Sequence, residues 1–146
     1  MMEDTAQEAV LVNNLQTWFK KNLAKTRVHD WEVHTEYPLE HNMRVDLVLR
    51  RNAFQKRIIG IEVKIPGMNI HKVATGIGQV MLYRQFLSEA WLAIPNESIK
   101  EFDYFLRKIP RFKVLDTELH NLLVNGVAYD VLEYLHGNRR ELNDLL

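Results

Sequence analysis

The sequence predicts an α/β protein of the α+β type, in which helices flank one mixed central sheet. Three observations predict this class. Apolar residues recur at helical spacing over 3–25 and again over 70–87. Between these helices, three segments carry strand patterns, over 31–37, 44–51 and 57–65. Finally, 146 residues with 47% hydrophobic side chains suit one domain with a core of its own.

Each of these helices and strands is predicted by its own residue pattern. The apolar stripe of the first helix consists of Leu11, Leu15, Trp18 and Phe19. In the first strand, apolar positions alternate with Glu32, His34 and Glu36 until Pro38. The second strand places Val45, Leu47 and Leu49 on one face. Gly76 and Gly78 each cost the second helix roughly 1 kcal/mol, so we expect them to allow close approach to the sheet.

The later elements follow from shorter patterns. They are expected as a strand over 89–94, a helix over 98–108, a strand over 112–116, a hairpin over 122–129 and a short helix over 138–146. Ser98 is a candidate N-cap for its helix. Asn125-Gly126 predicts a type I′ turn in the hairpin. The tail after Pro95 suits an oligomerisation element, a substrate-specific addition or extra core, and its pattern does not choose among them.

The order of the elements predicts the topology. One helix, three strands, a helix and a strand give an αβββαβ core over about 3–95, with a C-terminal extension over 96–146 in the same domain, 1–146. The three adjacent strands suggest an antiparallel meander, and the strand–helix–strand step suggests a right-handed parallel crossover.

Composition excludes several classes of protein. The 19 basic and 19 acidic residues balance, which argues against a generally basic nucleic-acid binder. Without cysteine there is no disulfide framework and no thiolate metal site. The polar, acidic start does not resemble a signal peptide, and no apolar run reaches the length of a membrane span. We therefore expect a cytoplasmic protein with no membrane partner.

Strand parity brings three polar residues together. Glu62 and Lys64 lie two residues apart on the same face of the third strand. Asp46 lies opposite to the apolar positions of the second strand. If the two strands pair as neighbours, Asp46 and Glu62 converge, and Gly60 leaves room beside them.

Two carboxylates and one ammonium group suit the hydrolysis of phosphodiesters. Asp46 and Glu62, with the backbone carbonyl of Val63, offer hard oxygen ligands to Mg²⁺. Lys64 can orient a water molecule or stabilise charge on the phosphate. Charged residues are also common on solvated sheet faces. Here, however, the charges interrupt the most apolar strand of the chain, where an unpaired charge is costly.

These residues resemble the PD-(D/E)XK nuclease superfamily, which has the restriction-endonuclease-like fold. The matching residues are Asp46 and then Glu62-Val63-Lys64, although Val45 stands where the family name has proline. Gln79 and Tyr83, four apart on the following helix, are similar to the Gln-x-x-x-Tyr motif of the RecB-like and λ-exonuclease-like branch. In that branch the two residues help to position the DNA and the active site.

The resemblance also implies an additional acidic residue. Members of the superfamily often supply one from the first helix or strand. Glu8 and Glu36 are the candidates, and Glu8 ranks first because that acid often comes from the helix.

The sequence thus predicts a Mg²⁺-dependent deoxyribonuclease, with Mn²⁺ as a substitute metal, acting on linear or end-bearing DNA. A structure-selective endonuclease of the Holliday-junction type is the nearest competing function, and cutting two strands would require a homodimer. Two classes without catalysis also fit the pattern. One is a nucleic-acid-binding or assembly module of the same fold, and the second is a partner-binding protein whose charged positions are merely solvated.

Overall fold

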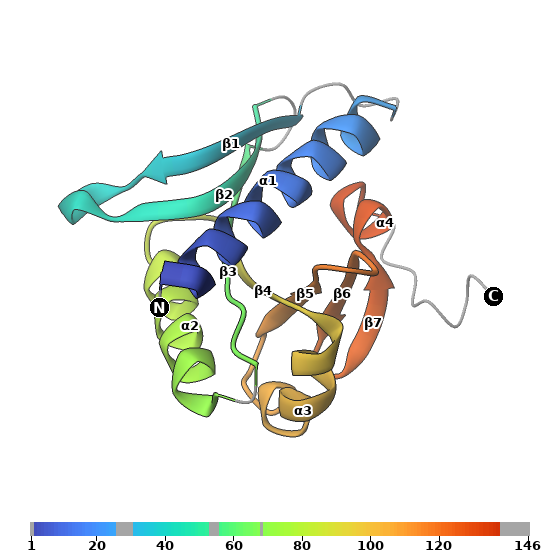
Figure 1. Ribbon diagram of the computed structural model, residues 1–146. Helices are drawn as coiled ribbons and strands as arrows, with labels where there is room; N and C mark the ends of the chain where they lie inside the picture. Colours follow the sequence, from blue (N-terminus) through green and yellow to red (C-terminus); the bar gives the residue numbers. More distant parts are fainter. Residues whose placement is uncertain (1, 26–30, 53–55, 68, 138–146) are drawn as a thin grey trace.

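The computed structural model describes residues 2–25, 31–52, 56–67 and 69–137, and shows one sheet with helices on both faces (Figure 1). The strands lie in the sheet in chain order, from β1 to β7. The elements are α1 (Met2–Ala24), β1 (Trp31–Pro38), the 3₁₀ turn η1 (Glu40–Asn42), β2 (Arg44–Arg51), β3 (Arg57–Val63), α2 (Ile70–Tyr83), β4 (Glu89–Ile94), α3 (Asn96–Leu106), β5 (Lys113–Asp116), β6 (Asn121–Val124), β7 (Val127–Asp130) and α4 (Val131–Leu135).

The sheet is mixed, as the sequence predicts. β1, β2 and β3 form an antiparallel meander, β3, β4 and β5 are parallel, and β6 and β7 continue as an antiparallel hairpin. Leu47 pairs with Ile61, so the register of β2 and β3, continued by one residue, sets Asp46 opposite Glu62. The structure therefore has the strand pairing that the candidate site requires.

The core has two layers, one on each face of the sheet. Under α1 and α4, the buried side chains include Leu15, Phe19, Leu47, Ile61, Trp91 and Leu135. Under α2 and α3, they include Val45, Val48, Val80, Leu92, Ile99 and Phe102. The extension after Pro95 thus continues the same sheet and supplies both layers of the core. No helix among the described residues has the length and apolarity needed to cross a membrane.

The alternation of β1 and β2 breaks where they meet near the candidate site. Glu36 has a positive φ of 51°, which is uncommon outside glycine. The paired registers continue on either side of Glu36 and Asp46. Val45 packs in the α2 layer although Leu47, two residues later, packs in the α1 layer. The expectation that Val45 shares a face with Leu47 and Leu49 is therefore wrong, and the change of face falls where the Glu36–Asp46 pair is missing from the register.

Several boundaries differ from the expected ones. β3 ends at Val63 and α2 ends at Tyr83. α3 begins at Asn96 with Pro95 as its N-cap, and Ser98 is buried within the helix, so Ser98 is not the cap. A proline suits this place because the start of a helix has no use for its missing N–H.

The end of the chain has one unexpected helix. α4 follows β7 directly, and the Asp130 side chain caps it by accepting from the Glu133 N–H. The expected helix over 138–146 lies outside the described residues. The turn at Asn125-Gly126 is confirmed, since both residues have positive φ, as a type I′ turn requires.

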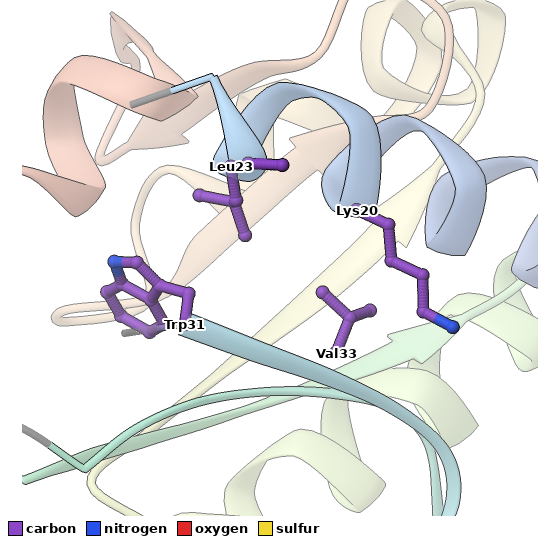
Figure 2. A pocket seen from close by; sticks show the side chains of 5 residues that line it. Lys20, Leu23, Trp31 and Val33 are labelled. Atoms are coloured by element: carbon purple, nitrogen blue, oxygen red, sulfur yellow. The ribbon is translucent and has the colours of Figure 1, made fainter. Parts of the chain in front are cut away.

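A hollow of about 300 Å³ opens between the end of α1 and the start of β1 (Figure 2). It is lined by Lys20, Leu23, Ala24, Trp31 and Val33. These side chains include no carboxylate or nucleophile that could serve a hydrolytic reaction. Trp31 and Asp46 stand at opposite ends of the β1–β2 pair, so this hollow is separate from the candidate site.

Candidate functional site

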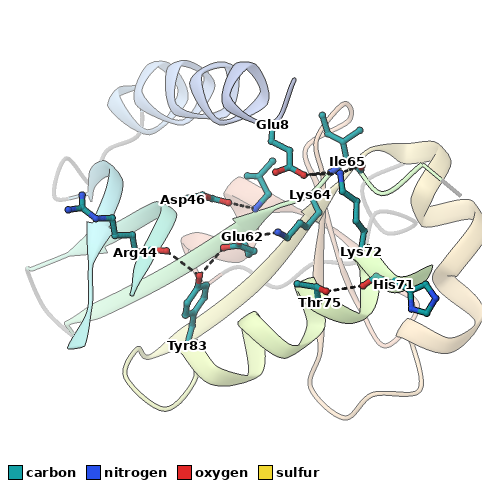
Figure 3. Close-up of polar contacts among 11 residues, drawn as sticks. Glu8, Arg44, Asp46, Glu62, Lys64, Ile65, His71, Lys72, Thr75 and Tyr83 are labelled. Atoms are coloured by element: carbon teal, nitrogen blue, oxygen red, sulfur yellow. Dashed lines mark hydrogen bonds and ion pairs between the residues drawn. The ribbon is translucent and has the colours of Figure 1, made fainter. Parts of the chain in front are cut away.

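Asp46, Glu62 and Lys64 meet between α1 and α2, where β2 and β3 end their pairing (Figure 3). The Val63 N–H donates to Asp46 Oδ2 across 2.9 Å. Lys64 Nζ lies 3.7 Å from Glu62 Oε1, as an ion pair. The structure thus brings the three predicted residues together, and a backbone amide fixes one of them.

Glu62 is a buried carboxylate held by a side chain from α2. Only 4% of the residue is exposed, and Tyr83 Oη lies 3.0 Å from its Oε2. The same hydroxyl lies 3.2 Å from the carbonyl oxygen of Arg44. Because a hydroxyl carries one hydrogen, Tyr83 can donate to only one of these acceptors at a time. Tyr83 therefore orients Glu62. The resemblance implied a positioning role for Tyr83, and this contact says which carboxylate it holds.

Both carboxyl groups have raised pKa values. Burial first, and then the charge of Asp46, raises the pKa of Glu62 to about 8, against the smaller effects of Lys64 and Tyr83. Burial also raises the pKa of Asp46, and the bond from the Val63 N–H opposes that rise. Two acids that resist ionisation together are poised to bind either a proton or a cation.

Gly76 allows α2 to lie close to the side chain of Lys64. A Cβ on Gly76 would lie 2.8 Å from Leu92 Cδ1 and 3.2 Å from Lys64 Cγ, so α2 comes close to the sheet here as expected. Gly78 has open space around it, so the same expectation is wrong for Gly78. Gly60 does not leave room beside the acids either, because Leu87 and Val45 fill the space next to it.

Glu8 reaches the site from α1. It accepts from the Ile65 N–H at 3.3 Å and lies 3.5 Å from Lys72 Nζ. Lys72 Nζ also donates to the Ile65 carbonyl at 3.2 Å, so one lysine joins α2, α1 and the segment that follows β3. Glu8 and Asp46 line the same cleft, and the charge of Glu8 contributes to the raised pKa of Asp46. No spacing signal in the sequence marks this contact of Lys72.

The second candidate acid, Glu36, lines a cleft of about 220 Å³ next to Asp46. Its lining residues are Glu8, Ala9, Val12, Asn13, Thr35, Glu36 and Asp46. The side chain of Glu36 is largely exposed and lies 3.8 Å from Arg44 Nη1. Glu8 therefore makes the closer connection to the site, and an accessory role for either acid remains a prediction.

Gln79 lies one helical turn before Tyr83. Its Oε1 atom is buried and has no hydrogen-bond partner among the described residues. A buried acceptor without a partner is costly, so the amide is suited to accept a donor that the described chain does not provide. Thr75, by contrast, donates to the His71 carbonyl of its own helix.

The donor set suits a hard divalent cation. Asp46, Glu62 and the Val63 carbonyl are oxygen ligands, the type that Mg²⁺ prefers. Within the described part of the chain, no group of three or more His, Cys, Asp or Glu side chains is arranged to hold a metal. An ion here would accordingly depend on backbone oxygen, water and substrate for its remaining ligands.

No family model and no curated protein matches the sequence. Among solved structures, the fold is similar to a protein of unknown function from Silicibacter pomeroyi, with 19% identity and a TM-score of 0.44. The match covers 67% of this chain and 60% of that chain, so this chain spans less than two thirds of that protein's length. Nothing about function follows from a likeness at this level.

Proposed function

We propose that this protein is a Mg²⁺-dependent deoxyribonuclease of the cytoplasm that acts on linear or end-bearing DNA, in the manner of the PD-(D/E)XK superfamily. One observation carries the proposal: two carboxylates, the buried Glu62 and the partly buried Asp46, stand beside a single lysine, Lys64. A structural ion pair needs only one acid for one lysine. The second acid makes the site attractive to a cation.

The residues that would hold Mg²⁺, or Mn²⁺ in its place, are Asp46, Glu62 and the Val63 carbonyl. Such an ion supplies charge that polarises a phosphodiester and favours ionisation of water. The Val63 N–H fixes Asp46, and the Tyr83 hydroxyl fixes Glu62, so both carboxylates are oriented before any ligand arrives.

Lys64 and Gln79 have the remaining roles in the proposed site. Lys64 forms its ion pair with Glu62 at a place where the ammonium group can contact a phosphate oxygen and stabilise charge that develops during hydrolysis. The buried Oε1 of Gln79 offers an acceptor on the same side of α2 as Tyr83. Asp46 and Glu62 need not exchange protons with the substrate directly. Their proposed role is to bind a cation next to it.

The test compares variants that keep shape but remove charge. Wild type, Asp46→Asn, Glu62→Gln and Lys64→Met would be incubated with linear duplex, single-stranded, circular and four-way-junction DNA, in Mg²⁺, Mn²⁺ or EDTA. Glu97→Gln and Lys100→Met, both on α3, are the matched controls. We expect metal-dependent cleavage of the linear substrates and a loss of at least about 100-fold in the three site variants. Absence of cleavage on every substrate, or equal cleavage by site and control variants, would overturn the proposal.

A further inference from the structure

A second charged cleft lies at the opposite end of the parallel strands. Glu62 stands five residues after Arg57 in β3, so the two ends are roughly 16 Å apart at about 3.3 Å per residue. The cleft has a volume of about 340 Å³ and is lined by Arg84, Ser88, Glu89, Arg111 and Lys113. A neighbouring hollow of about 280 Å³ shares the last three of these and adds Val124, Tyr129 and Tyr134.

The one carboxylate in this cleft is already engaged. Glu89 pairs with Arg57 at 3.1 Å and with Lys113 Nζ at 3.5 Å, and it accepts from the Trp91 indole N–H at 2.6 Å. Arg84 and Arg111 form no ion pair with any carboxylate in the described ranges. Four cationic side chains therefore surround a single, fully engaged acid.

The Arg84 side chain is held against the backbone of Arg111. Arg84 donates to the carbonyl oxygen of Arg111, and its guanidinium lies 5.6 Å from the centre of the Phe112 ring. Arg111 has a positive φ of 58°, a conformation that a side chain of its size seldom adopts. Burial and the charge of Arg111 lower the pKa of Arg84. Two guanidinium groups that line one cleft repel each other, and Glu89 offsets this repulsion only in part, so an anion between them would be favourable.

Ser88 adds a neutral donor. Its Oγ accepts from the Ile58 N–H at 3.1 Å and donates to no acceptor in the described part of the chain. The hydroxyl hydrogen can thus serve a ligand in the cleft. A hydroxyl with two guanidinium groups is the donor set that binds a tetrahedral oxyanion well, because arginine offers paired N–H donors.

We propose that this cleft binds a phosphate group, with Arg84, Arg111 and Ser88 as its donors. The phosphate belongs either to a free nucleotide or to a nucleic-acid strand, and the hollow beside Tyr129 takes the attached nucleoside. The site is separate from the carboxylate centre, and it does not depend on the proposed nuclease function.

The test titrates the full-length, ¹⁵N-labelled protein in EDTA at low salt. The probes are inorganic phosphate, thymidine 5′-monophosphate and a 5′-phosphorylated single-stranded octanucleotide, and the readout is the Nε–H signals of the arginines. We expect saturable shifts of Arg84 and Arg111. Arg111→Gln should weaken binding at least about tenfold, and Arg84→Gln should act likewise. Since Arg111 is exposed, its substitution keeps the test valid if Arg84→Gln fails to fold.

The controls test whether binding needs these two arginines. Lys100→Gln and Glu97→Gln, both on α3, should bind all three probes as wild type does. Stronger binding of the nucleotide than of the octanucleotide supports the free-nucleotide source, and the reverse supports the strand. If no probe binds saturably, or if Arg111→Gln binds as tightly as wild type, the proposal is overturned.

Discussion

The Asp46 carboxylate takes the place of a backbone partner for Val63, accepting its N–H across 2.9 Å just beyond the last paired residues of β2 and β3. One oxygen of Asp46 thus holds the strands together, while the charge of the group lies next to Glu62. The structural and chemical roles of this aspartate can therefore be separated by substitution.

Asp46→Asn and Asp46→Ala should divide these roles. Asparagine keeps an oxygen acceptor for the Val63 N–H, so the free energy of unfolding should stay within about 1 kcal/mol of wild type, while cleavage is lost. Alanine leaves that N–H without a partner and should cost a further 1–3 kcal/mol, approximately. Urea denaturation measures both. Equal stability of the two variants would show that the hydrogen bond to Val63 contributes nothing.

Stability should depend on pH through Glu62. The folded-state pKa of this carboxyl is about 8, above its ordinary value of 4.5, so the folded protein holds the proton more tightly than the unfolded chain. The stabilisation is complete below pH 4.5 and is lost as pH rises towards and through 8. In metal-free protein the unfolding free energy should fall by an amount on the order of a few kcal/mol over this window.

Glu62→Gln removes the titrating group and should flatten that curve, whereas Glu97→Gln should follow wild type. Added Mg²⁺ should restore the stability of wild type at a pH of about 9 and leave Glu62→Gln unchanged, since a ligand of the folded state stabilises it. Denaturation at several pH values, with and without the metal, measures these effects. Parallel curves for wild type and Glu62→Gln would refute the assigned pKa shift.

The two glycines of α2 should respond in opposite directions to alanine. Gly78→Ala meets open space and should stabilise the protein by about 0.5–1 kcal/mol through helix propensity. Gly76→Ala would push against Leu92 and the stem of Lys64, so overpacking of about 1–3 kcal/mol should outweigh that gain. Gly76→Ala should also lower cleavage by displacing Lys64. Thermal unfolding and the cleavage assay distinguish the two, and a stabilising Gly76→Ala would contradict the close approach.

Tyr83→Phe removes the hydroxyl that touches Glu62 and the Arg44 carbonyl. Because the Tyr83 hydrogen bond lowers the pKa of Glu62, its loss should move that pKa above about 8. The variant should lose roughly 1 kcal/mol of stability, and its metal-dependent activity should require a higher pH. A pH–rate profile tests this. A stability loss without any change in the profile would assign Tyr83 a purely structural role.

Strand periodicity was enough to find the main parts of the site. Alternation placed Glu62 and Lys64 on one face, and neighbouring strands placed Asp46 beside them. The contact of Lys72 with Glu8 could not be predicted, because it joins two helices 64 residues apart in sequence. The change of face between Val45 and Leu47 was also hidden, since nothing in the residue type of Glu36 indicates its positive φ.

Local signals were reliable where one residue determines a conformation and failed where packing decides. Asn125-Gly126 predicted its turn because few other residues accept two positive φ angles. The environment of Gly60 and Gly78 depends on which distant side chains arrive, and only the fold shows that. α4 is too short for an apolar stripe to reveal it, and its packing against Trp91 supplies the stability that its length does not.

The continuation of the sheet beyond β4 limits how the protein can be shortened. A fragment that ends at Pro95 would leave the backbone groups of β4 without β5 as a partner. It would also uncover Trp91, which is fully buried and lies against Tyr134. An unpaired sheet edge beside an exposed indole favours self-association of the fragment over a soluble folded unit. We therefore expect the residues up to Pro95 and the tail after them to be inseparable in solution.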